Sequence, residues 1–139
     1  MEDVGVTLSA VPASVGVARQ AVTDLARAGG FGPFPAALLT SELVANAVEH
    51  ARTPVRLHIR LLADQVLRVE VHDDAGASDE LEALIADPPA RVDPLALRGR
   101  GLLLVRRLAD RFGLSPRADG GKAVWFELDP GGQRVDDAR

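Results

Sequence analysis

The sequence predicts a two-layer α/β sandwich, in which a mixed, largely antiparallel sheet carries helices on one face. Segments 55–62 and 66–72 each alternate apolar and polar residues and are joined by three residues, as in a hairpin with one buried face. Two helical patterns precede this hairpin, and the expected order is strand, helix, helix, strand, strand, loop, helix, strand, strand. Because hairpins dominate this order, the pattern does not favour a doubly wound parallel sheet.

The N-terminal elements are a strand and a helix. Val4–Val11 alternates apolar residues with small or polar ones and predicts the first strand, which a proline ends. Ser14 is the expected N-cap of a helix that runs to about Arg27 and stops at a Gly-Gly pair. Pro35 then suits the first turn of the next helix.

That next helix contains the stretch SELVANAVEHA, residues 41–51, around which the chain is organised. Glu42, Asn46 and His50 follow one another at four-residue intervals, so a helix places them along one side. The opposite arc is apolar and is expected to face the core; it consists of Leu43, Val44, Ala47, Val48 and Ala51.

Two leucines indicate that the polar side of this helix is not fully open to water, since Leu38 and Leu39 are expected to project towards it. An acid, an amide and an imidazole beside partly covered apolar surface suit a polar ligand or a metal ion. The alternative is an amphipathic helix whose polar face is solvated.

The segment 73–97 is rich in Asp, Ala and Pro and has only a weak helical pattern. A segment of this length with so little regular structure is usually a functional lid or mobile, and we expect a lid at about 75–98. The RGRG motif, Arg98–Gly101, then opens a helix that is expected to run to about Phe112.

The C-terminal part predicts a second hairpin. Residues 113–117 are expected to form a short strand and Lys122–Leu128 the last strand, with a tight turn at 119–121 between them. Residues 131–139 are polar and are expected to be a flexible tail. Residues 1–130 are therefore expected to form a single domain, since nothing marks a repeat or a second unit.

The composition of the chain argues against several classes of protein. The net charge is −4 over 139 residues, and because phosphate neutralisation requires a basic surface, no nucleic-acid partner is expected. No apolar run approaches the roughly 18–20 residues that span a bilayer, and the acidic start does not resemble a secretion signal. The absence of cysteine excludes disulfides and thiol nucleophiles. We expect a cytoplasmic protein without a membrane segment.

Three groups of residues at the ends of elements can carry chemistry: the stripe Glu42, Asn46 and His50, the VHDDAG motif at 71–76, and RGRG at 98–101. Glycines at a helix N-terminus let backbone amides approach an anion, and arginines there suit phosphate. Taken singly, a Gly-x-Gly pattern more often marks a tight loop, and an Asp at a strand end is usually a turn former. Their joint order along this topology favours one shared site.

Glu-x-x-x-Asn on a helix, an Asp at a strand end, a variable lid and Gly-x-Gly into a helix together resemble the Bergerat-type ATP-binding domain of histidine kinases, gyrase B and related ATPases. ELVANAVEHA, VEVHDDAG, RGRGLLLV and GGKAVWFEL look like the small actinobacterial proteins related to anti-sigma-factor serine/threonine kinases. The resemblance covers about residues 4–129 and implies ATP and Mg²⁺ as cofactors.

The resemblance implies a role for each matching residue. Asn46 would hold Mg²⁺ through its amide oxygen, which is a hard ligand. Glu42 would be the catalytic general base towards a serine hydroxyl or a water molecule. Asp73 or Asp74 would read the amine of adenine, with Gly76 in the same motif.

The RGRG motif would bind the phosphates of the nucleotide. Gly99, Gly101 and the adjacent Leu102 would surround them with backbone amides, and Arg98 or Arg100 would supply positive charge. Positioning and charge neutralisation would then supply most of the rate.

Two departures from the family pattern bear on the adenine site. In the family pattern a glycine follows the adenine-binding Asp by two residues, and Gly76 follows Asp74 at this spacing. Strand alternation instead points Asp73 to the buried face, and this favours Asp73 as the adenine-binding residue. The last strand commonly offers a threonine near the adenine, where this chain has Lys122, Ala123 and Val124, and the loss of that hydroxyl would remove a water-mediated contact to adenine.

The leading interpretation is an ATP- and Mg²⁺-dependent serine/threonine kinase that phosphorylates an anti-sigma-factor antagonist and so regulates a sigma factor. The alternative is a non-catalytic nucleotide-binding module that controls a protein–protein contact. Glu42 favours the kinase, whereas the missing threonine favours the module. The resemblance also implies a homodimer, although no motif marks its interface. A scaffold without nucleotide is the third interpretation.

Overall fold

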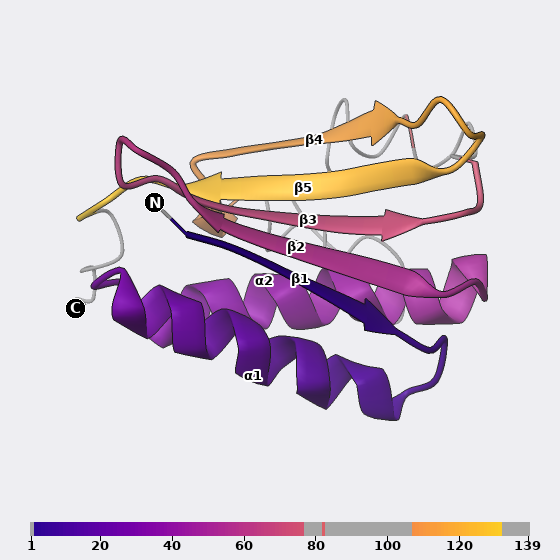
Figure 1. The fold of residues 1–139 in the computed structure, drawn as a ribbon, viewed down its shortest axis with the longest axis horizontal. Helices are drawn as coiled ribbons and strands as arrows, with labels where there is room; N and C mark the ends of the chain where they lie inside the picture. Colours follow the sequence, from indigo (N-terminus) through magenta and orange to yellow (C-terminus); the bar gives the residue numbers. More distant parts are fainter. Residues whose placement is uncertain (1, 77–81, 83–106, 132–139) are drawn as a thin grey trace.

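The computed structural model describes residues 2–76, 82 and 107–131 of the chain (Figure 1). Its strands are β1 (Glu2–Leu8), β2 (Val55–Leu61), β3 (Leu67–Asp73), β4 (Arg111–Pro116) and β5 (Lys122–Leu128). Its helices are α1 (Ala13–Ala28), α2 (Pro33–Asn46) and η1 (Ala47–Ala51), a π-helical continuation of α2. Within these residues, no helix is long and apolar enough to cross a membrane.

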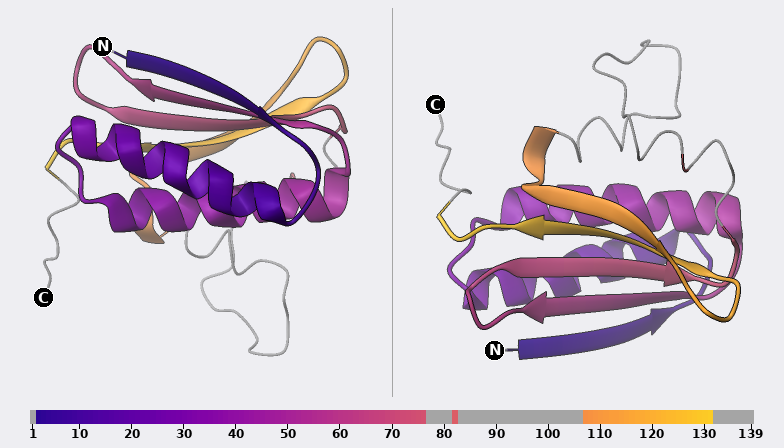
Figure 2. Two further views of the ribbon diagram at one scale, coloured as in Figure 1. Left: turned by 60° about the horizontal axis from the view of Figure 1, so that its bottom comes forward. Right: turned by 90° about the horizontal axis from the view of Figure 1, so that it is seen from above.

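The five strands form one sheet in the order β1-β2-β3-β5-β4. Every pairing among these strands is antiparallel. β5 lies between β3 and β4, so the final hairpin extends the sheet on the side of β3. The helices α1 and α2 lie side by side on one face of the sheet (Figure 1 and Figure 2). The predicted two-layer α/β sandwich is confirmed, with a sheet that is antiparallel rather than mixed in its described strands.

The core lies between the sheet and the two helices. β2 and β3 alternate buried and partly exposed residues along their whole length, so each presents one face to the helices. Burying each large side chain contributes about 1.5–3 kcal/mol relative to leaving it exposed. Those that are fully buried include Phe126, Leu39, Leu57, Ile59, Leu67 and Leu128.

The apolar arc predicted for the second helix is confirmed at Leu43, Val44 and Ala47, which are buried. Leu39, which was expected to project towards the polar side, is fully buried in the core. Leu39 precedes Leu43 by one helical turn and therefore shares its face. Of the two leucines, Leu38 alone is only partly buried.

The predicted N-cap of the first helix is wrong. α1 begins at Ala13 with Pro12 in the N-cap position, and no side chain caps it. Ser14 is buried inside the first turn, and its hydroxyl donates to the Ser9 carbonyl at 2.7 Å. Ser14 therefore joins the helix to the connection that follows β1.

The helix predicted to reach Phe112 ends earlier than expected. Arg111 and Phe112 belong to β4, and the Asp110 backbone N–H already donates to the Glu127 carbonyl at 2.9 Å. Pairing with β5 satisfies these backbone groups and packs Phe112 against the core, which outweighs a weak local preference for helix. In the described residues before β4, helix is present at 107–108.

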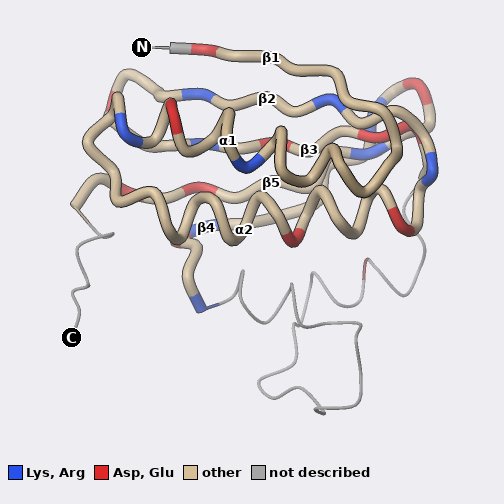
Figure 3. The backbone as a smooth tube through the Cα atoms, turned by 90° about the horizontal axis from the view of Figure 1, so that it is seen from below, with Lys and Arg blue, Asp and Glu red and all other residues tan. Residues whose placement is uncertain are grey.

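The outer face of the sheet, away from the helices, carries a network of ion pairs; charged residues of both signs are spread along the strands (Figure 3). Arg68 is at its centre and donates to Glu70 and to Glu127, at 2.6 Å in each case. Its guanidinium carbon also lies 4.2 Å from the centroid of the Trp125 ring, a cation–π contact. One arginine thus joins two strands through two carboxylates and a ring.

The two carboxyl groups of this network have lowered pKa values. Burial alone would raise the pKa of Glu70, but hydrogen bonds from Arg68 and His72 outweigh it and lower the pKa. At Glu127, burial is likewise outweighed by hydrogen bonds from Arg111 and Arg68, so its pKa is also lowered. Both groups therefore stabilise the fold in their ionised form.

Replacing Arg68 with methionine should lower the free energy of unfolding by about 1–3 kcal/mol, because two partly buried carboxylates lose their shared partner. A lowered carboxyl pKa stabilises the fold above the unfolded value of about 4.3 and loses this effect as the pH falls through the folded value. The difference between parent and variant should therefore shrink as the pH falls below about 4. Urea denaturation at pH 7 and at lower pH measures both effects.

The matched control for this prediction is Arg27→Met at the exposed end of α1, which should change stability by less than about 0.5 kcal/mol. Equal losses for the two variants, or a loss at Arg68 that does not change with pH, would contradict the role given to the network.

Candidate functional site

Two of the predicted groups lie at the same end of the sandwich, where η1, the end of β3 and the start of β5 meet (Figure 1). The Asp74 backbone N–H donates to Thr53 Oγ1 at 3.0 Å, and Arg56 donates to the Asp74 carboxylate at 2.9 Å. Because Thr53 and Arg56 closely follow η1, these contacts join the end of β3 to the helix that carries Glu42 and Asn46.

The helix that carries the first group changes its winding at Asn46. α2 ends there, and in the π-turn that follows the Arg52 backbone N–H donates to the Ala47 carbonyl, five residues back, at 3.3 Å. Glu42 is half-buried, whereas Asn46 and His50 are exposed. His50 lies within this wider turn, one turn after Asn46. Single π-turns within helices are frequent at functional sites.

Asp73 is the buried carboxylate at the end of β3, with 2% of its surface exposed. It continues the inward-facing series of Val69 and Val71, so the side-chain direction predicted from strand alternation is confirmed. Its Oδ1 accepts hydrogen bonds from the Ala75 backbone N–H and from the Lys122 ammonium, each at 2.9 Å. The carboxylate therefore lies on the face of the sheet that the helices cover.

Asp74 faces the opposite way and is exposed. Arg56 donates to its carboxylate at 2.9 Å and Arg117 at 3.2 Å. Hydrogen bonds from these guanidinium groups, chiefly that of Arg56, lower the pKa of the Asp74 carboxyl. Asp73 is thus the candidate for a ligand on the inner face, while Asp74 takes part in surface ion pairs. Their roles in nucleotide binding remain predictions.

Lys122 is a site residue for which the sequence predicted no contact, although it belongs to the stretch 122–124 that lacks the threonine of the family pattern. It is the first residue of β5, it pairs directly with Asp73 across the strands, and it is 8% exposed. Its ammonium donates to the Asp73 carboxylate at 2.9 Å and to the Ala75 carbonyl at 3.2 Å. Lysine is rarely this buried unless it is paired. Only the register of β3 with β5 identifies this partner, and no local pattern specifies that register.

The turn before β5 packs tightly against the end of β3. A Cβ at Gly121 would lie 2.3 Å from the Asp73 carbonyl oxygen, so a larger residue cannot fit without movement of the backbone. Arg117 donates to the same carbonyl at 2.8 Å. Gly76, which was predicted to share the adenine motif, is exposed and lies close to Gly120, since an added Cβ would meet its carbonyl oxygen at 3.3 Å. These contacts fix the backbone that orients the Asp73 carboxylate.

The model of one protein family, the histidine kinase-like ATPase domain, matches residues 8–128, which is most of the chain. The chain belongs to the histidine kinase-like ATPase domain family. No curated protein sequence matches it.

Solved structures share the fold of this ATPase domain. A chain of the SiaB–SiaC complex from Pseudomonas aeruginosa matches with a TM-score of 0.66 and 15% identity, over 90% of this chain and 88% of the other. The RsbU and RsbW domains of Rv1364c from Mycobacterium tuberculosis match with a TM-score of 0.63 and 17% identity over 93% of this chain, which spans 32% of the mycobacterial one. The histidine kinase domain of the blue-light activated histidine kinase EL346 from Erythrobacter litoralis matches with a TM-score of 0.56 and 22% identity, over 92% and 65%. At these identities the likeness is one of fold.

Residues of the ATPase domain fit the nucleotide and the metal ion that its family implies. Asn46 presents an exposed amide oxygen at the end of α2, and this type of atom suits Mg²⁺ as a ligand. Asp73 presents a fixed carboxylate on the inner face, which suits the amine of a base. The described part of the domain therefore offers Asp73 for the base of a nucleotide and Asn46 for the metal ion at its phosphates.

The phosphate-binding motif predicted for this ATPase domain lies outside the described residues, as does most of the predicted lid. Ala75, Gly76 and Glu82 are the members of the lid segment that are described, and Gly131 is the one described residue of the predicted tail. The roles of five residues stay predictions: Arg98, Gly99, Arg100, Gly101 and Leu102.

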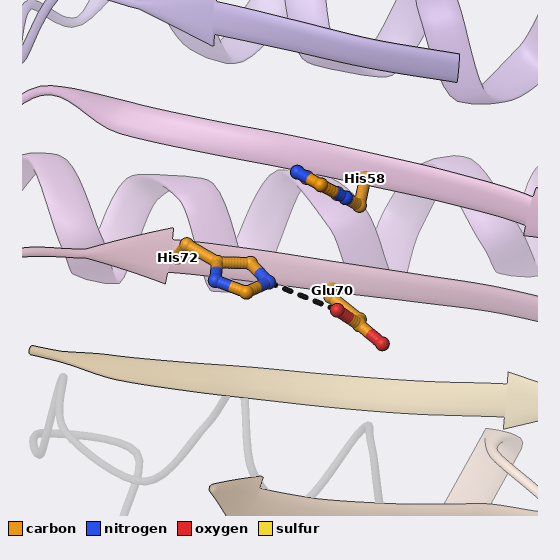
Figure 4. A group of neighbouring side chains, drawn as sticks. All are labelled: His58, Glu70 and His72. Carbon is orange, nitrogen blue, oxygen red and sulfur yellow. Dashed lines mark hydrogen bonds and ion pairs between the residues drawn. The ribbon is translucent and has the colours of Figure 1, made fainter. Parts of the chain in front are cut away.

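A second group of metal-binding residue types lies on the outer face of the sheet (Figure 4). His58, Glu70 and His72 each have a ligand atom within 4.8 Å of those of the other two. Glu70 Oε1 lies 2.9 Å from His72 Nε2, and Arg68 donates to the other carboxylate oxygen at 2.6 Å. Because Arg68 already neutralises this carboxylate, we do not assign a metal site here: Glu70 and His72 belong to the ion-pair network, and the His58 ring lies 4.9 Å from the His72 ring.

Replacing Gly121 with alanine should destabilise the protein by about 1–3 kcal/mol, because the new Cβ overlaps the Asp73 carbonyl oxygen and must displace it. Urea denaturation measures the loss, and the amide NMR shift of Asp73 reports whether the strand end moves. Gly16→Ala in α1 is the control, since its added Cβ meets nothing within 4 Å. Gly16→Ala should be neutral or stabilise by up to about 1 kcal/mol. If both variants behave alike, the tight packing at Gly121 does not position the site.

Proposed function

We propose that this domain binds ATP with Mg²⁺ and transfers the γ-phosphoryl group to a serine or threonine of an anti-sigma-factor antagonist, so that a sigma factor is regulated. The observation that carries the proposal is the buried carboxylate of Asp73, held on the inner face at the same end of the sandwich as the helix with Glu42 and Asn46. Membership of the histidine kinase-like ATPase domain family supports the nucleotide. The protein substrate rests on the sequence resemblance to anti-sigma-factor kinases.

The residues of the chain divide the reaction between binding and proton transfer. Asp73 would accept a hydrogen bond from the exocyclic amine of adenine and so fix the base. Asn46 would hold the Mg²⁺ ion, which when bound neutralises phosphate charge. Glu42 would accept the proton of the attacking hydroxyl as the new P–O bond forms and the bond to the β-phosphate oxygen breaks.

Similar folds are found in structures together with a second protein or domain, and this supports protein partners for the present domain. One similar structure is a complex of SiaB with SiaC, and another joins RsbU and RsbW domains in one chain. By analogy, this domain would meet a small antagonist protein and a sigma factor, and it would also pair with a second copy of itself. Such partners place the proposed activity in the cytoplasm.

A second candidate function is a nucleotide-binding module that controls a protein–protein contact and transfers no phosphate. The observation that favours it is Lys122, which engages the carboxylate meant for the base. The two functions share the nucleotide and differ only in the chemistry at Glu42.

Asn46→Ala should weaken the binding of a non-hydrolysable ATP analogue about tenfold or more in the presence of Mg²⁺, and little in its absence, because the amide oxygen would ligate the metal. Calorimetry with and without Mg²⁺ measures this difference. Gln20→Ala, which removes an exposed amide from α1, is the matched control and should bind as the parent does. No binding to the parent protein at millimolar ligand would rule out both candidate functions.

Glu42→Gln should keep nucleotide affinity and lower phosphotransfer by about 10²–10⁴-fold, since a positioned general base contributes that much. The assay uses radiolabelled ATP and antagonist proteins encoded near the gene. Glu49→Gln, an exposed carboxylate on the same helix, should retain full activity. Transfer that survives in Glu42→Gln would show that Glu42 is not the base, whereas nucleotide binding without any transfer by the parent would favour the regulatory module.

A further inference from the structure

The base end of the proposed nucleotide site contains a buried ion pair, of which the nucleotide contacts proposed above use only Asp73. Asp73 and Lys122 face each other across the ladder of β3 and β5, and they are 2% and 8% exposed. The Lys122 ammonium lies 2.9 Å from Asp73 Oδ1 and 3.2 Å from the Ala75 carbonyl oxygen. An ammonium group that leaves water in this way needs strong partners, and it has two.

Each member of this pair retains hydrogen-bonding capacity towards a ligand. An ammonium has three N–H donors, of which the Asp73 carboxylate and the Ala75 carbonyl take two. Asp73 Oδ1 accepts from Ala75 and Lys122, while Oδ2 accepts no hydrogen bond from the described part of the chain. The pair therefore offers a ligand one acceptor and one donor, side by side.

The pair is also held in place before any ligand arrives. Arg117 donates to the Asp73 carbonyl at 2.8 Å, and Gly121 packs against the same group. The Ala75 carbonyl anchors the ammonium from the other side. Such a fixed arrangement costs little ordering entropy on binding, and this is the property that makes polar groups selective.

We propose that Lys122 contacts the base of the nucleotide directly and determines its identity. Adenine carries a donor, the exocyclic amine at position 6, next to an acceptor, the ring nitrogen N1. With the amine on Asp73, as in the proposed function on which this inference rests, N1 lies on the side of Lys122 and accepts from its ammonium.

The same pair rejects a 6-oxopurine in this orientation. Guanine and hypoxanthine carry a carbonyl oxygen at position 6, which would face the Asp73 carboxylate, and an N1–H donor, which would face the ammonium. Both contacts become repulsive, and a buried polar group that is left unpaired is costly. Lys122 is therefore a specificity-determining residue for adenine, and its role goes beyond balancing the charge of Asp73.

Removal of single ring nitrogens from the nucleotide tests this contact. The parent protein is titrated in a calorimeter, with Mg²⁺, against ATP, 1-deaza-ATP and 7-deaza-ATP. A hydrogen bond from a charged donor is worth about tenfold to hundredfold in affinity, so 1-deaza-ATP should bind that much more weakly than ATP. 7-Deaza-ATP, which changes the other edge of the base, is the control and should bind like ATP. Equal affinity for ATP and 1-deaza-ATP would overturn the inference.

The variant Lys122→Met tests the same contact from the side of the protein. It should bind ATP more weakly than the parent and should no longer distinguish ATP from 1-deaza-ATP, because the donor to N1 is gone. Arg111→Met, which removes a charge from the exposed strand β4, should keep the preference of the parent. If Lys122→Met binds ATP more tightly, the ion pair competes with the base and the inference is wrong. If Lys122→Met does not fold, the comparison of the three nucleotides on the parent protein still decides.

The proposed function and this inference fail in different ways. A parent protein that binds none of the three nucleotides overturns the function, and the inference with it. A parent that binds ATP and 1-deaza-ATP alike keeps the function and loses only the role of Lys122.

Discussion

The pairing of β3 with β5 is the interaction on which both the core and the site depend. β3 buries Val69, Val71 and then Asp73 on one face, and β5 lies against it in a register that sets Asp73 opposite Lys122. A slip of one residue along β3 would turn its apolar row and the carboxylate outwards together. The register that excludes water from the core therefore also orients the polar group at its end.

Much of this arrangement follows from local patterns in the sequence. Strict alternation in 55–62 and 66–72 predicts the central hairpin within one residue at each end, because side chains of a strand point alternately to two faces. The same rule gives the direction of Asp73. The apolar arc of the second helix likewise follows from its period, as the burial of Leu43 and Val44 confirms. Residues that are close to one another in the sequence are sufficient to predict these features.

The features that the sequence did not predict are those decided by contacts between distant segments. Pairing with β5 draws Phe112 into a strand although its neighbours favour a helix. The ion pair of Asp73 with Lys122 joins residues on non-consecutive strands, so no spacing along the chain indicates it. The π-turn after Asn46 leaves the sequence pattern of an α-helix unchanged, and only the hydrogen bond of Arg52 to Ala47 reveals it.

Lys122 has a further consequence, because it is the only lysine in the chain. Apart from the α-amino group, amine chemistry is thus confined to one buried position that balances a carboxylate. Acylation there would remove a positive charge from the interior and leave the Asp73 carboxylate without that partner. The reactivity of the Lys122 amine towards an acylating reagent would therefore measure how often the end of β3 opens to solvent.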